Sequence, residues 1–481
     1  MTGTLSFPER KNAIRDLADR IAPAFEKWRQ RNDYFHVEDE RYTRFLATGL
    51  GGKVLDLGCG NGDLLASLEP EIGLGIDFSK KTVEAARARH PDLEFKLGDV
   101  EDPLLLTSLE GPFDLIVLSD TIGELEDVQS TLLHLHALCH DETRIIIAYH
   151  SQYWGPLLKT VESMGLKRPS QPQNWLSSTD IAALLDLAEF DIIMREWRQL
   201  IPLRLFGLGR LINRFIAPLP FIRKLCVRSY LVARSTRVEP MDNPSATVVI
   251  PCRNEKGNVE PAINRMPPFC DDIEVIFVEG GSSDGTWEEI ERVIAARPDL
   301  NIKAIKQPGK GKGDAVRAGF VAAGGDILMI QDADLTAPPE DLPKFYNALA
   351  SRRGDFINGT RLIYPMDSEA MRFLNLVANN IFSLTFSWLL NQRFTDTLCG
   401  TKVLTRENYV RIAENRSYFG EFDPFGDFDL ILGAARLNMK VEEIPVRYRA
   451  RQYGSTQISR FRHGLMLLRM TIFAFMKLKA I

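Results

Sequence analysis

Cysteine is scarce in this sequence of 481 residues: six cysteines occur, widely separated and never as a Cys-x-x-Cys pair. That pattern argues against a zinc cluster and a disulfide framework, and it suits a reducing cytoplasm. Positive charge is not in excess either, because the formal net charge is −5. Since nucleic-acid binding depends on a basic surface, we expect no nucleic-acid partner.

Long apolar segments are also missing. The amino terminus is charged and predicts a helix, so it lacks the apolar core of a signal peptide. The longest charge-free run, residues 373–392, contains seven Asn, Ser and Thr residues and is too polar to cross a bilayer. We therefore expect a cytoplasmic protein without a transmembrane helix.

The length exceeds what one hydrophobic core supports, so we expect two main domains of α/β class. A polar, proline-bearing segment over residues 239–246 predicts the linker between them. The predicted order is a helical extension (1–48), a first domain (49–238) with a basic apolar insert (199–228), a second domain (247–458) and a basic amphipathic helix (459–481). We expect the extension to form two helices, separated at Tyr34–His36.

Closely spaced glycines follow the first predicted strand of the first domain, residues 53–57. Gly58, Gly60 and Gly62 let the backbone approach a ligand, and the next helix offers free N–H groups. The second strand ends in Asp77, whose carboxylate can accept both hydroxyls of a ribose. Two further predicted strands end in Gly98-Asp99-Val100 and in Ser119-Asp120.

This succession resembles the class I S-adenosylmethionine-dependent methyltransferases, over residues 34–236. The resemblance implies a Rossmann-like sheet with S-adenosylmethionine as its cofactor. The residues that it implies for cofactor binding are Asp56, Gly58, Gly60, Gly62, Asp77, Phe78, Asp99, Val100 and Ser119. Asp120, His150 and His36 are candidates for a catalytic base, although each could equally have a structural role.

Residues 197–238 contain nine Arg or Lys and no Asp or Glu. Leucine, isoleucine and phenylalanine fill the spaces between the charges, as in residues 208–216. Basic charge interleaved with bulky apolar residues indicates a surface that lies on anionic lipid. The alternative is an apolar face packed on a neighbouring domain, with arginine side chains reaching outward.

Two carboxylates stand one residue apart in the second domain. Asp332-Ala333-Asp334 follows a predicted buried strand, residues 326–330, and Pro338-Pro339 is predicted to begin a helix. Ligands bind at the carboxyl ends of parallel strands, and neighbouring carboxylates tolerate each other when they share a hard cation. We predict Mg²⁺ or Mn²⁺ with a diphosphate at Asp332 and Asp334. The alternative is a turn that these aspartates merely solvate.

Three earlier strands, predicted over 247–251, 274–278 and 302–306, deliver polar residues to the same edge. Over residues 246–460 the chain resembles family 2 glycosyltransferases of GT-A fold, particularly the polyprenyl-phosphate sugar synthases. The resemblance implies a nucleotide-sugar donor, bound by Pro251, Arg253, Asn254, Glu255, Glu279, Asp284, Lys310, Lys312, Asp332, Ala333 and Asp334. Glu279-Gly280 replaces the family's pair of aspartates, so the nucleotide base stays open.

The predicted acceptor is a polyprenyl phosphate or a glycan hydroxyl. A lipid monophosphate, with a second pKa of about 6, is already a nucleophile at neutral pH. A hydroxyl would need a carboxylate to take its proton. The arginines that could clamp an acceptor phosphate are Arg361, Arg372, Arg449 and Arg451. The residues predicted to act in catalysis are Asp334, Asp396, Asp427, Asp429 and Arg361.

Membrane contact is a further expectation, because eight basic residues and no acidic ones follow Glu443. An apolar stripe is predicted beside the acceptor site, at Leu374, Val377, Ile381, Leu384 and Trp388. We expect a bifunctional methyltransferase and glycosyltransferase, peripheral on the cytoplasmic membrane face. The alternatives are transfer to a surface glycan, and a catalytically silent amino-terminal domain that positions the transferase.

Overall fold

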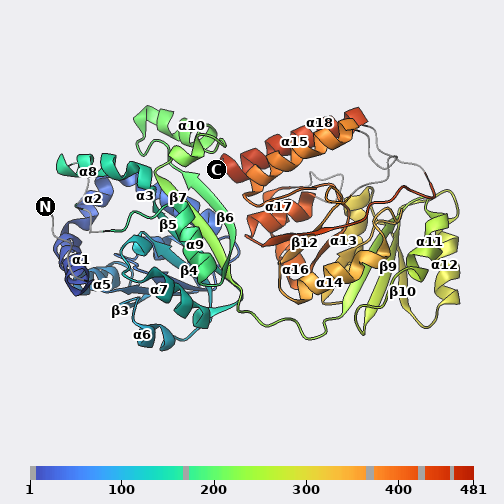
Figure 1. The fold of residues 1–481 in the computed structure, drawn as a ribbon, viewed down its shortest axis with the longest axis horizontal. Coiled ribbons are helices and arrows are strands. Elements are labelled where there is room, and N and C mark those ends of the chain that lie inside the picture. Colours follow the sequence, from blue (N-terminus) through green and yellow to red (C-terminus); the bar gives the residue numbers. More distant parts are fainter. Residues whose placement is uncertain (1–6, 166–168, 170–172, 365–372, 421–427, 455–459) are drawn as a thin grey trace. The chain divides into compact units, whose positions relative to one another are not determined.

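The computed structural model describes residues 7–165, 169, 173–364, 373–420, 428–454 and 460–481 (Figure 1). Its contacts divide the chain into two compact units. The first unit runs to Val238 and includes Lys479–Ile481, and the second runs from Glu239 to Leu478. Within the segment predicted as a helix over 459–481, α18 spans Arg460–Ala474 and a π-helical turn continues over Phe475–Lys479. By its contacts, Lys479–Ile481 is assigned to the first unit.

A seven-stranded sheet forms the centre of the first unit, in the order β3-β2-β1-β4-β5-β7-β6. Its strands are β1 (Lys53–Leu57), β2 (Ile72–Asp77), β3 (Glu94–Leu97), β4 (Phe113–Ser119), β5 (Cys139–His150), β6 (Phe190–Arg198) and β7 (Arg228–Ser235). β1 to β5 are parallel, and β7 is antiparallel to both of its neighbours. β2 and β3 lie on one side of β1, and β4 and β5 lie on the other. In sheets with such a change of direction, ligands bind in a crevice at the carboxyl ends of the central strands, here β1 and β4.

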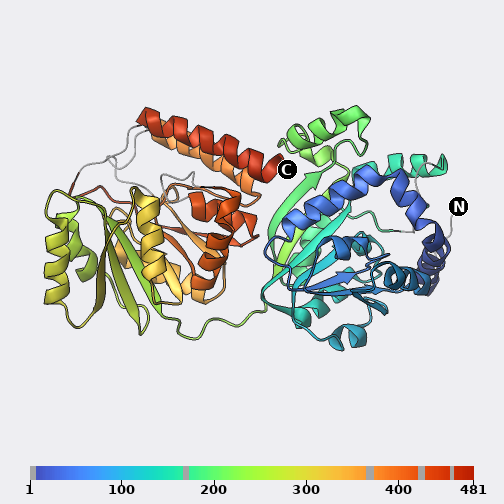
Figure 2. The same ribbon diagram turned by 180° about the vertical axis from the view of Figure 1, so that it is seen from behind.

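Helices cover both faces of this sheet, as the two opposite views show (Figures 1 and 2). One core joins the sheet to α6 (Pro103–Thr107), α7 (Val128–Leu135) and α9 (Ser178–Leu187). The other core joins it to α3 (Asp33–Leu46), α4 (Asp63–Ser67) and α5 (Lys80–Arg89). The strands are apolar on both sides because both sides are covered.

The amino-terminal segment differs from its prediction. It forms α1 (Phe7–Ile21), a 3-10 turn (Ala22–Ala24), α2 (Phe25–Arg31) and α3, so Tyr34–His36 lie in the first turn of α3 instead of between helices. The break falls at Asn32, whose side-chain amide donates to the carbonyl of Trp28. Asn competes for backbone partners in this way, which explains why the helix stops there.

Three short helices fill the connection between β6 and β7, and α8 (Gly155–Ser163) follows β5. The connection contains a 3-10 turn (Leu205–Gly207), α10 (Leu208–Phe215) and a second 3-10 turn (Arg223–Leu225). The remaining 3-10 turns of the first unit are Thr121–Gly123, His136–Leu138 and Gln152–Trp154. Arg198 and Arg228 are direct neighbours in the ladder, so the long insert replaces what could be a tight hairpin turn.

A second seven-stranded sheet has the order β10-β9-β8-β11-β13-β12-β14. Its strands are β8 (Ala246–Cys252), β9 (Ile273–Glu279), β10 (Asn301–Lys306), β11 (Ile327–Ile330), β12 (Phe356–Thr360), β13 (Lys402–Thr405) and β14 (Val441–Pro445). The first four strands in this order are parallel, and β13 is antiparallel to both neighbours. The carboxyl ends of β8, β9, β10 and β11 consequently share one edge.

The helices of the second unit are α11 (Lys256–Asn264), α12 (Thr286–Ala296), α13 (Lys312–Ala322), α14 (Leu342–Ala350), α15 (Phe373–Leu390), α16 (Arg406–Glu414), α17 (Phe428–Arg436) and α18, with a 3-10 turn at Arg416–Tyr418. A 3-10 turn, Pro339–Asp341, precedes α14 where Pro338-Pro339 was predicted to begin a helix. The core on one face combines the sheet with α11, α12 and α14. Within the described ranges, no helix combines the length and apolarity that membrane crossing needs.

Candidate active sites

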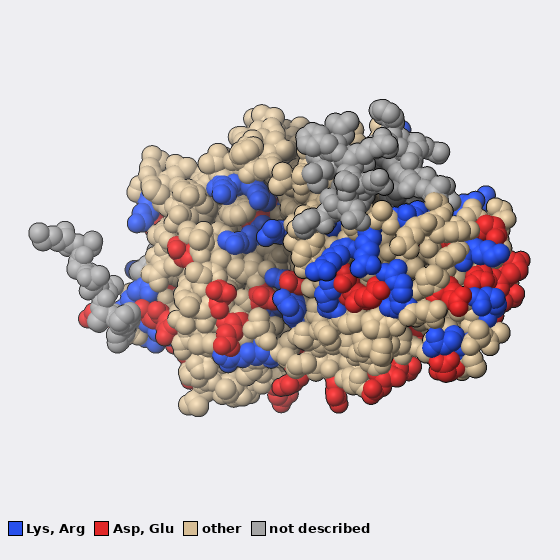
Figure 3. All heavy atoms as spheres, turned by 45° about the vertical axis from the view of Figure 1, so that its right-hand side comes forward, with Lys and Arg blue, Asp and Glu red and all other residues tan. Residues whose placement is uncertain are grey.

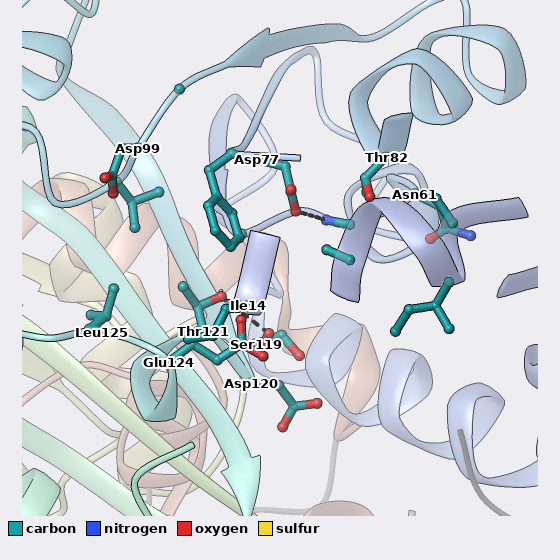
Figure 4. Close-up of a pocket in the computed structure, with 18 of the residues that line it drawn as sticks. Ile14, Asn61, Asp77, Thr82, Asp99, Ser119, Asp120, Thr121, Glu124 and Leu125 are labelled. Atoms are coloured by element: carbon teal, nitrogen blue, oxygen red, sulfur yellow. Dashed lines mark hydrogen bonds between the residues drawn. The ribbon is translucent and has the colours of Figure 1, made fainter. Parts of the chain in front are cut away.

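A pocket in the first unit opens at the carboxyl ends of its central strands (Figure 4). Gly58 and Gly60 line it just after β1, Asp77 and Phe78 at the end of β2, and Ser119 and Asp120 at the end of β4. Asp99 and Val100 line it after β3. Four strands that are far apart in sequence thus contribute to one cavity, at the crevice that the sheet order creates.

Asp77 is held by backbone donors at this pocket. Its carboxylate accepts hydrogen bonds from Gly60 N at 3.1 Å and from Ser79 N at 2.9 Å. Burial raises the pKa of Asp77 to about 6, although these two hydrogen bonds act in the opposite direction. Gly60 has a φ of +54° and open space where a Cβ would lie. The residues therefore fit a cofactor with a diol and a chain that passes close to the backbone.

Two of the residues predicted to bind the cofactor do not line the pocket. A Cβ at Gly62 would lie 2.5 Å from the ring of Phe95, so this glycine allows close packing within the unit. Asp56 is buried, and its Oδ1 has no hydrogen-bond partner among the described residues. Burial, with a smaller effect from the charge of Asp77, raises the pKa of Asp56 to about 7.

The sequence prediction missed the contribution of α1 to the pocket wall. Lys11, Ile14, Ala18 and Ile21 line the pocket, and Lys11 forms an ion pair with Asp99. Ile14, Ala18 and Ile21 recur at helical spacing, so the apolar stripe was the available signal. Further lining residues that were not predicted are Asn61, Thr82, Thr121, Glu124 and Leu125 (Figure 4).

A charged cluster borders the pocket at Asp120, which has an uncommon φ of +63°. The carboxylate of Asp120 is 2.9 Å from Nδ1 of His150 at the end of β5, and it also pairs with Arg228. Burial would raise the pKa of Asp120, but the charges of Arg228 and His150 hold it well below its usual range. Among the predicted base candidates, Asp120 and His150 are thus in contact.

Arg228 holds this cluster together from inside the unit. Its side chain is buried and donates to Asp39 through Nε at 2.8 Å and Nη2 at 3.0 Å. Nη2 also donates to Ser119 Oγ at 2.7 Å. The ring of Phe35 stacks on His150 at a centroid distance of 5.5 Å. His36, the third candidate, packs edge-on against Phe35.

In the second unit, polar residues from three strand ends lie together. Arg451 donates to Glu255, which follows β8, at 2.8 Å, and to Asp334, which follows β11, at 2.7 Å. Asn254 Oδ1 accepts from Ser283 N at 2.9 Å, and Ser282 N donates to Glu279 at the end of β9 at 2.5 Å. These contacts make one site of residues that are up to about 200 positions apart in sequence.

The two aspartates predicted to bind a metal each face a cation. Asp332 Oδ1 is 2.7 Å from Lys312 Nζ, and Asp334 Oδ2 is 2.7 Å from Arg451 Nη2. Burial would raise the pKa of Asp332, but the charge of Lys312 holds it below its usual value. A Cβ at Gly400 would lie 2.0 Å from Asp332, so only glycine fits there.

This donor set suits a metal that the protein does not enclose. Among the described residues, no group of three or more His, Cys, Asp or Glu side chains could hold an ion. Mg²⁺ is typically bound by one or two carboxylates and completes its shell with water and substrate phosphate. Asp332 and Asp334 fit that role, with Lys312 and Arg451 as cations that phosphate oxygens could also meet.

Other residues predicted for the donor occupy the same edge with different roles. Asp284 accepts hydrogen bonds from Lys256 N and from Thr286, and several such donors hold its pKa low against the effect of burial. Arg253 and Lys310 are exposed, whereas Ala333 is buried. Pro251 lies within β8. Lys306, which was not predicted, lies 4.8 Å from the ring centre of Trp287.

Two of the residues predicted for the acceptor and catalysis, Arg361 and Asp396, pair with each other. Arg361 donates to Asp396 through Nε at 2.6 Å and Nη2 at 2.9 Å. Burial would raise the pKa of Asp396, but Arg361 lowers it below its usual value. Asp429 pairs with Arg416 at 2.8 Å, and Arg449 is exposed. Asp427 and Arg372 lie outside the described residues.

Comparison with known proteins identifies both halves of the chain. The family model for glycosyl transferase family 2 matches residues 247–410, and a methyltransferase domain model matches residues 11–194. A dolichyl-phosphate hexose transferase from Haloferax volcanii is 31% identical over 193 residues, which are 40% of this chain and 76% of the relative. The chain belongs to glycosyl transferase family 2. It also carries a methyltransferase domain, as the sequence predicted.

Further similarities involve a second curated relative and a solved structure. A dolichol-phosphate mannosyltransferase from Pyrococcus furiosus is 34% identical over 119 residues, which are 24% of this chain and 33% of that protein. The chain spans 32% to 44% of the length of the first three curated relatives. A solved methyltransferase from Thermotoga maritima, a possible histamine N-methyltransferase, aligns over 46% of this chain and 99% of its own at 14% identity, with a TM-score of 0.35.

Proposed function

We propose that the second unit transfers a sugar from a nucleotide-sugar donor to a polyprenyl phosphate, with Mg²⁺ or Mn²⁺ bound at Asp332 and Asp334. The main support for this proposal is that Arg451 pairs with both Glu255 and Asp334. These ion pairs bring the ends of β8 and β11 together with the basic segment that follows β14. A divalent ion there would neutralise the departing diphosphate. Lys312 and Arg451 would add positive charge at the same oxygens.

The state of the carboxylates favours a phosphate acceptor. A hydroxyl acceptor needs a base, but Asp396 is tied to Arg361 by two hydrogen bonds, and its pKa is lowered in spite of burial. Asp429 is likewise paired with Arg416. A lipid monophosphate needs no such base, since its second pKa is about 6. The exposed Arg449 is then available to an acceptor phosphate.

The outer surface of the second unit supports contact with a membrane. Ile381 and Leu384 on α15 are exposed, and so are Leu468 and Ile472 on α18. Trp388 lies against Phe475 at 5.8 Å, so the two helical segments pack together while these apolar side chains face outward. We propose that this surface lies on the cytoplasmic face of a membrane, where a polyprenyl phosphate would be met.

For the first unit we propose S-adenosylmethionine binding and methylation of a sugar or a lipid-linked acceptor. The cofactor, when bound, supplies an electrophilic methyl group. Asp77 would accept the ribose hydroxyls, and Gly58 and Gly60 would pass its amino-acid part. Nδ1 of His150 lies 2.9 Å from Asp120. In the neutral tautomer that donates Nδ1–H to Asp120, Nε2 would accept a proton from a hydroxyl or amine nucleophile.

A direct test of sugar transfer uses a panel of nucleotide sugars and short-chain polyprenyl phosphates, with products identified by mass. The wild-type protein is expected to form one glycosyl lipid that requires Mg²⁺ or Mn²⁺. Asp334→Asn should reduce turnover by about a hundredfold or more, because it removes a charged metal ligand. Asp299→Asn, an aspartate that pairs with Arg297 just before the amino end of β10, is the matched control. Full activity of Asp334→Asn in excess chelator would refute the metal site.

Cofactor binding is tested separately by calorimetry with S-adenosylmethionine. We expect binding by the wild-type protein and at least tenfold weaker binding by Asp77→Asn, because the amide replaces a charged acceptor of two hydroxyls. Asp102→Asn changes an exposed helix cap outside the pocket and should bind normally. If the wild-type protein binds no cofactor, the first unit is a silent module that positions the transferase.

A further inference from the structure

The insert between β6 and β7 exposes an unusual amount of apolar surface. Ten of the thirty large hydrophobic side chains exposed on the described residues fall within residues 203–225. They are Leu203, Leu205, Phe206, Leu208, Leu211, Phe215, Ile216, Leu219, Phe221 and Leu225, and we call them the insert surface. Such a concentration marks an interaction site, since single exposed apolar residues are common but clustered ones are not.

The helix in this insert, α10, turns its apolar side chains outward and its polar Asn213 inward. Gly209, Asn213 and Ala217, spaced four residues apart along α10 and just beyond it, are buried. Leu208, Leu211 and Phe215 are exposed. A surface helix of a soluble domain normally buries its apolar stripe and exposes its polar one. Here the amide faces the protein, so the apolar stripe is left for a partner.

Specific contacts fix the insert in place. The side chain of Asn213 accepts from Ile201 N at 2.9 Å and donates to Ile201 O at 2.7 Å and to Tyr34 at 3.1 Å. Gly209 packs so closely that a Cβ would lie 2.0 Å from Leu203 O. Trp154 Nε1 donates to Leu225 O at 2.8 Å. These contacts therefore fix the backbone that carries the outward-facing apolar side chains.

The backbone is strained where two of these side chains are exposed. Leu205 and Phe206 have φ angles of +41° and +54°, in the left-handed region that large side chains avoid. Phe206 is fully exposed, and Phe221 is 94% exposed. Strain of this kind persists where surrounding structure enforces it and commonly accompanies function. Within the described residues, nothing in the fold itself covers these two rings.

The charge of the insert selects among possible partners. Residues 199–227 contain five basic residues and no acidic one. Arg210 and Lys224 are exposed. Anionic lipid complements both the positive charge and the apolar surface of the insert.

We propose that the insert surface is a membrane-docking element of the methyltransferase unit, which inserts Phe206 and Phe221 into the interface of an anionic bilayer. The base of the insert contacts Tyr34 through Asn213 and Phe35 through Gln199. Phe35 in turn stacks on His150 beside the cofactor pocket. Docking thus brings the methyl-transfer site to the bilayer surface, independently of any contact that the second unit makes.

The first test places a reporter at the insert. In full-length protein, Phe206→Trp is mixed with phosphatidylglycerol vesicles that contain brominated lipid, and its fluorescence is compared with that of the wild-type protein. The added fluorescence is expected to shift to the blue and to be quenched by bromine. Leu104→Trp, at a position 78% exposed in the same unit but outside the insert, should show neither change.

Two results would overturn the proposal. One is sedimentation of Phe206→Trp with the vesicles without quenching, which would mean that the protein binds the membrane by another surface. The other is a blue shift before vesicles are added, which would mean that the insert packs on protein. Neither result would bear on sugar transfer, which is measured with short-chain acceptors in the absence of vesicles.

The second test removes the insert's apolar and basic groups in turn. Phe206→Ser with Phe221→Ser should weaken vesicle binding about tenfold or more, because two aromatic rings no longer leave water. Arg210→Gln with Lys224→Gln should weaken binding to anionic vesicles by roughly 30-fold at low salt and much less at high salt. The matched control, Leu104→Ser with Leu187→Ser, removes two exposed apolar residues outside the insert. Equal loss in the control, or no loss in either insert variant, would refute the proposal.

Discussion

The substitution Asp56→Asn tests whether Asp56 binds the cofactor or is a buried carboxyl outside the cofactor pocket. Asp56 follows the pattern of a cofactor ligand in the sequence, but it is buried on β1 and does not line the pocket. Its Oδ1 has no hydrogen-bond partner among the described residues. We therefore expect this substitution to change the pH dependence of stability while cofactor affinity changes little.

The magnitude follows from the pKa of Asp56, which burial raises from 3.8 to about 7. A carboxyl with a raised pKa in the folded state binds more protons than in the unfolded state between these values. The folded protein consequently loses stability as the pH rises from about 4 to 7. One pH unit corresponds to 1.36 kcal/mol, so the loss reaches about 4 kcal/mol at pH 8, of which about 2 kcal/mol falls between pH 5.5 and 8.

Thermal unfolding of the wild-type protein and Asp56→Asn at these two pH values measures the effect. About 2 kcal/mol corresponds to roughly 4–8 °C for a unit of this size. Asp56→Asn should therefore gain about that much in Tm relative to the wild-type protein between pH 5.5 and 8. The comparison between pH values cancels the cost of burying an amide, which is the same at both.

Calorimetry with S-adenosylmethionine completes the test. We expect the affinity of Asp56→Asn to stay within about threefold of wild type, in contrast to the loss proposed for Asp77→Asn. If Tm falls equally with pH in the wild-type protein and in Asp56→Asn, the pKa of Asp56 is not raised by burial, and the prediction is wrong. Loss of cofactor binding with normal folding would show that Asp56 contacts the cofactor.

Further predictions concern the charged contacts of both units. Arg451→Gln should strengthen Mn²⁺ binding several-fold in the absence of nucleotide, because it removes the cation paired with Asp334, and electron paramagnetic resonance would detect the change; weaker binding would contradict this. Asp396→Asn should destabilise the second unit by about 3–5 kcal/mol, because Arg361 is left without its buried partner, and chemical denaturation would measure the loss. Arg228→Met should destabilise the first unit by a similar amount, about 3–5 kcal/mol, because Asp39 and Asp120 lose their shared cation; a stable variant would mean that this cluster is hydrated.

Local patterns were sufficient to predict the strands that build both sites. Asp77, Ser119, Glu279 and Asp332 each end or closely follow an apolar run, and the structure has β2, β4, β9 and β11 there. The break at Asn32 was harder to predict, since helix boundaries depend on single side-chain contacts with the backbone. The extension over residues 1–48 was accordingly divided at the wrong place.

Contacts between distant residues could not be predicted from spacing. Asp396 and Arg361 each look available in the sequence, yet they occupy one another as a buried pair. Asp120 and His150 are thirty residues apart, and the pairing of β4 with β5 brings them into contact. The sequence also left open whether the apolar residues of the insert point inward, and the burial of Asn213 decides that they point outward.

The sequence by itself determined that this chain joins two α/β domains and where each bears its polar residues, because alternating apolar runs and glycine-rich turns act over a few neighbours. It also determined the family, through residues 247–410. Only the tertiary structure decided which charges neutralise each other, as Arg451 does for Glu255 and Asp334. Electrostatic partners and burial depend on how strands and helices pack, and packing joins residues that sequence distance keeps apart.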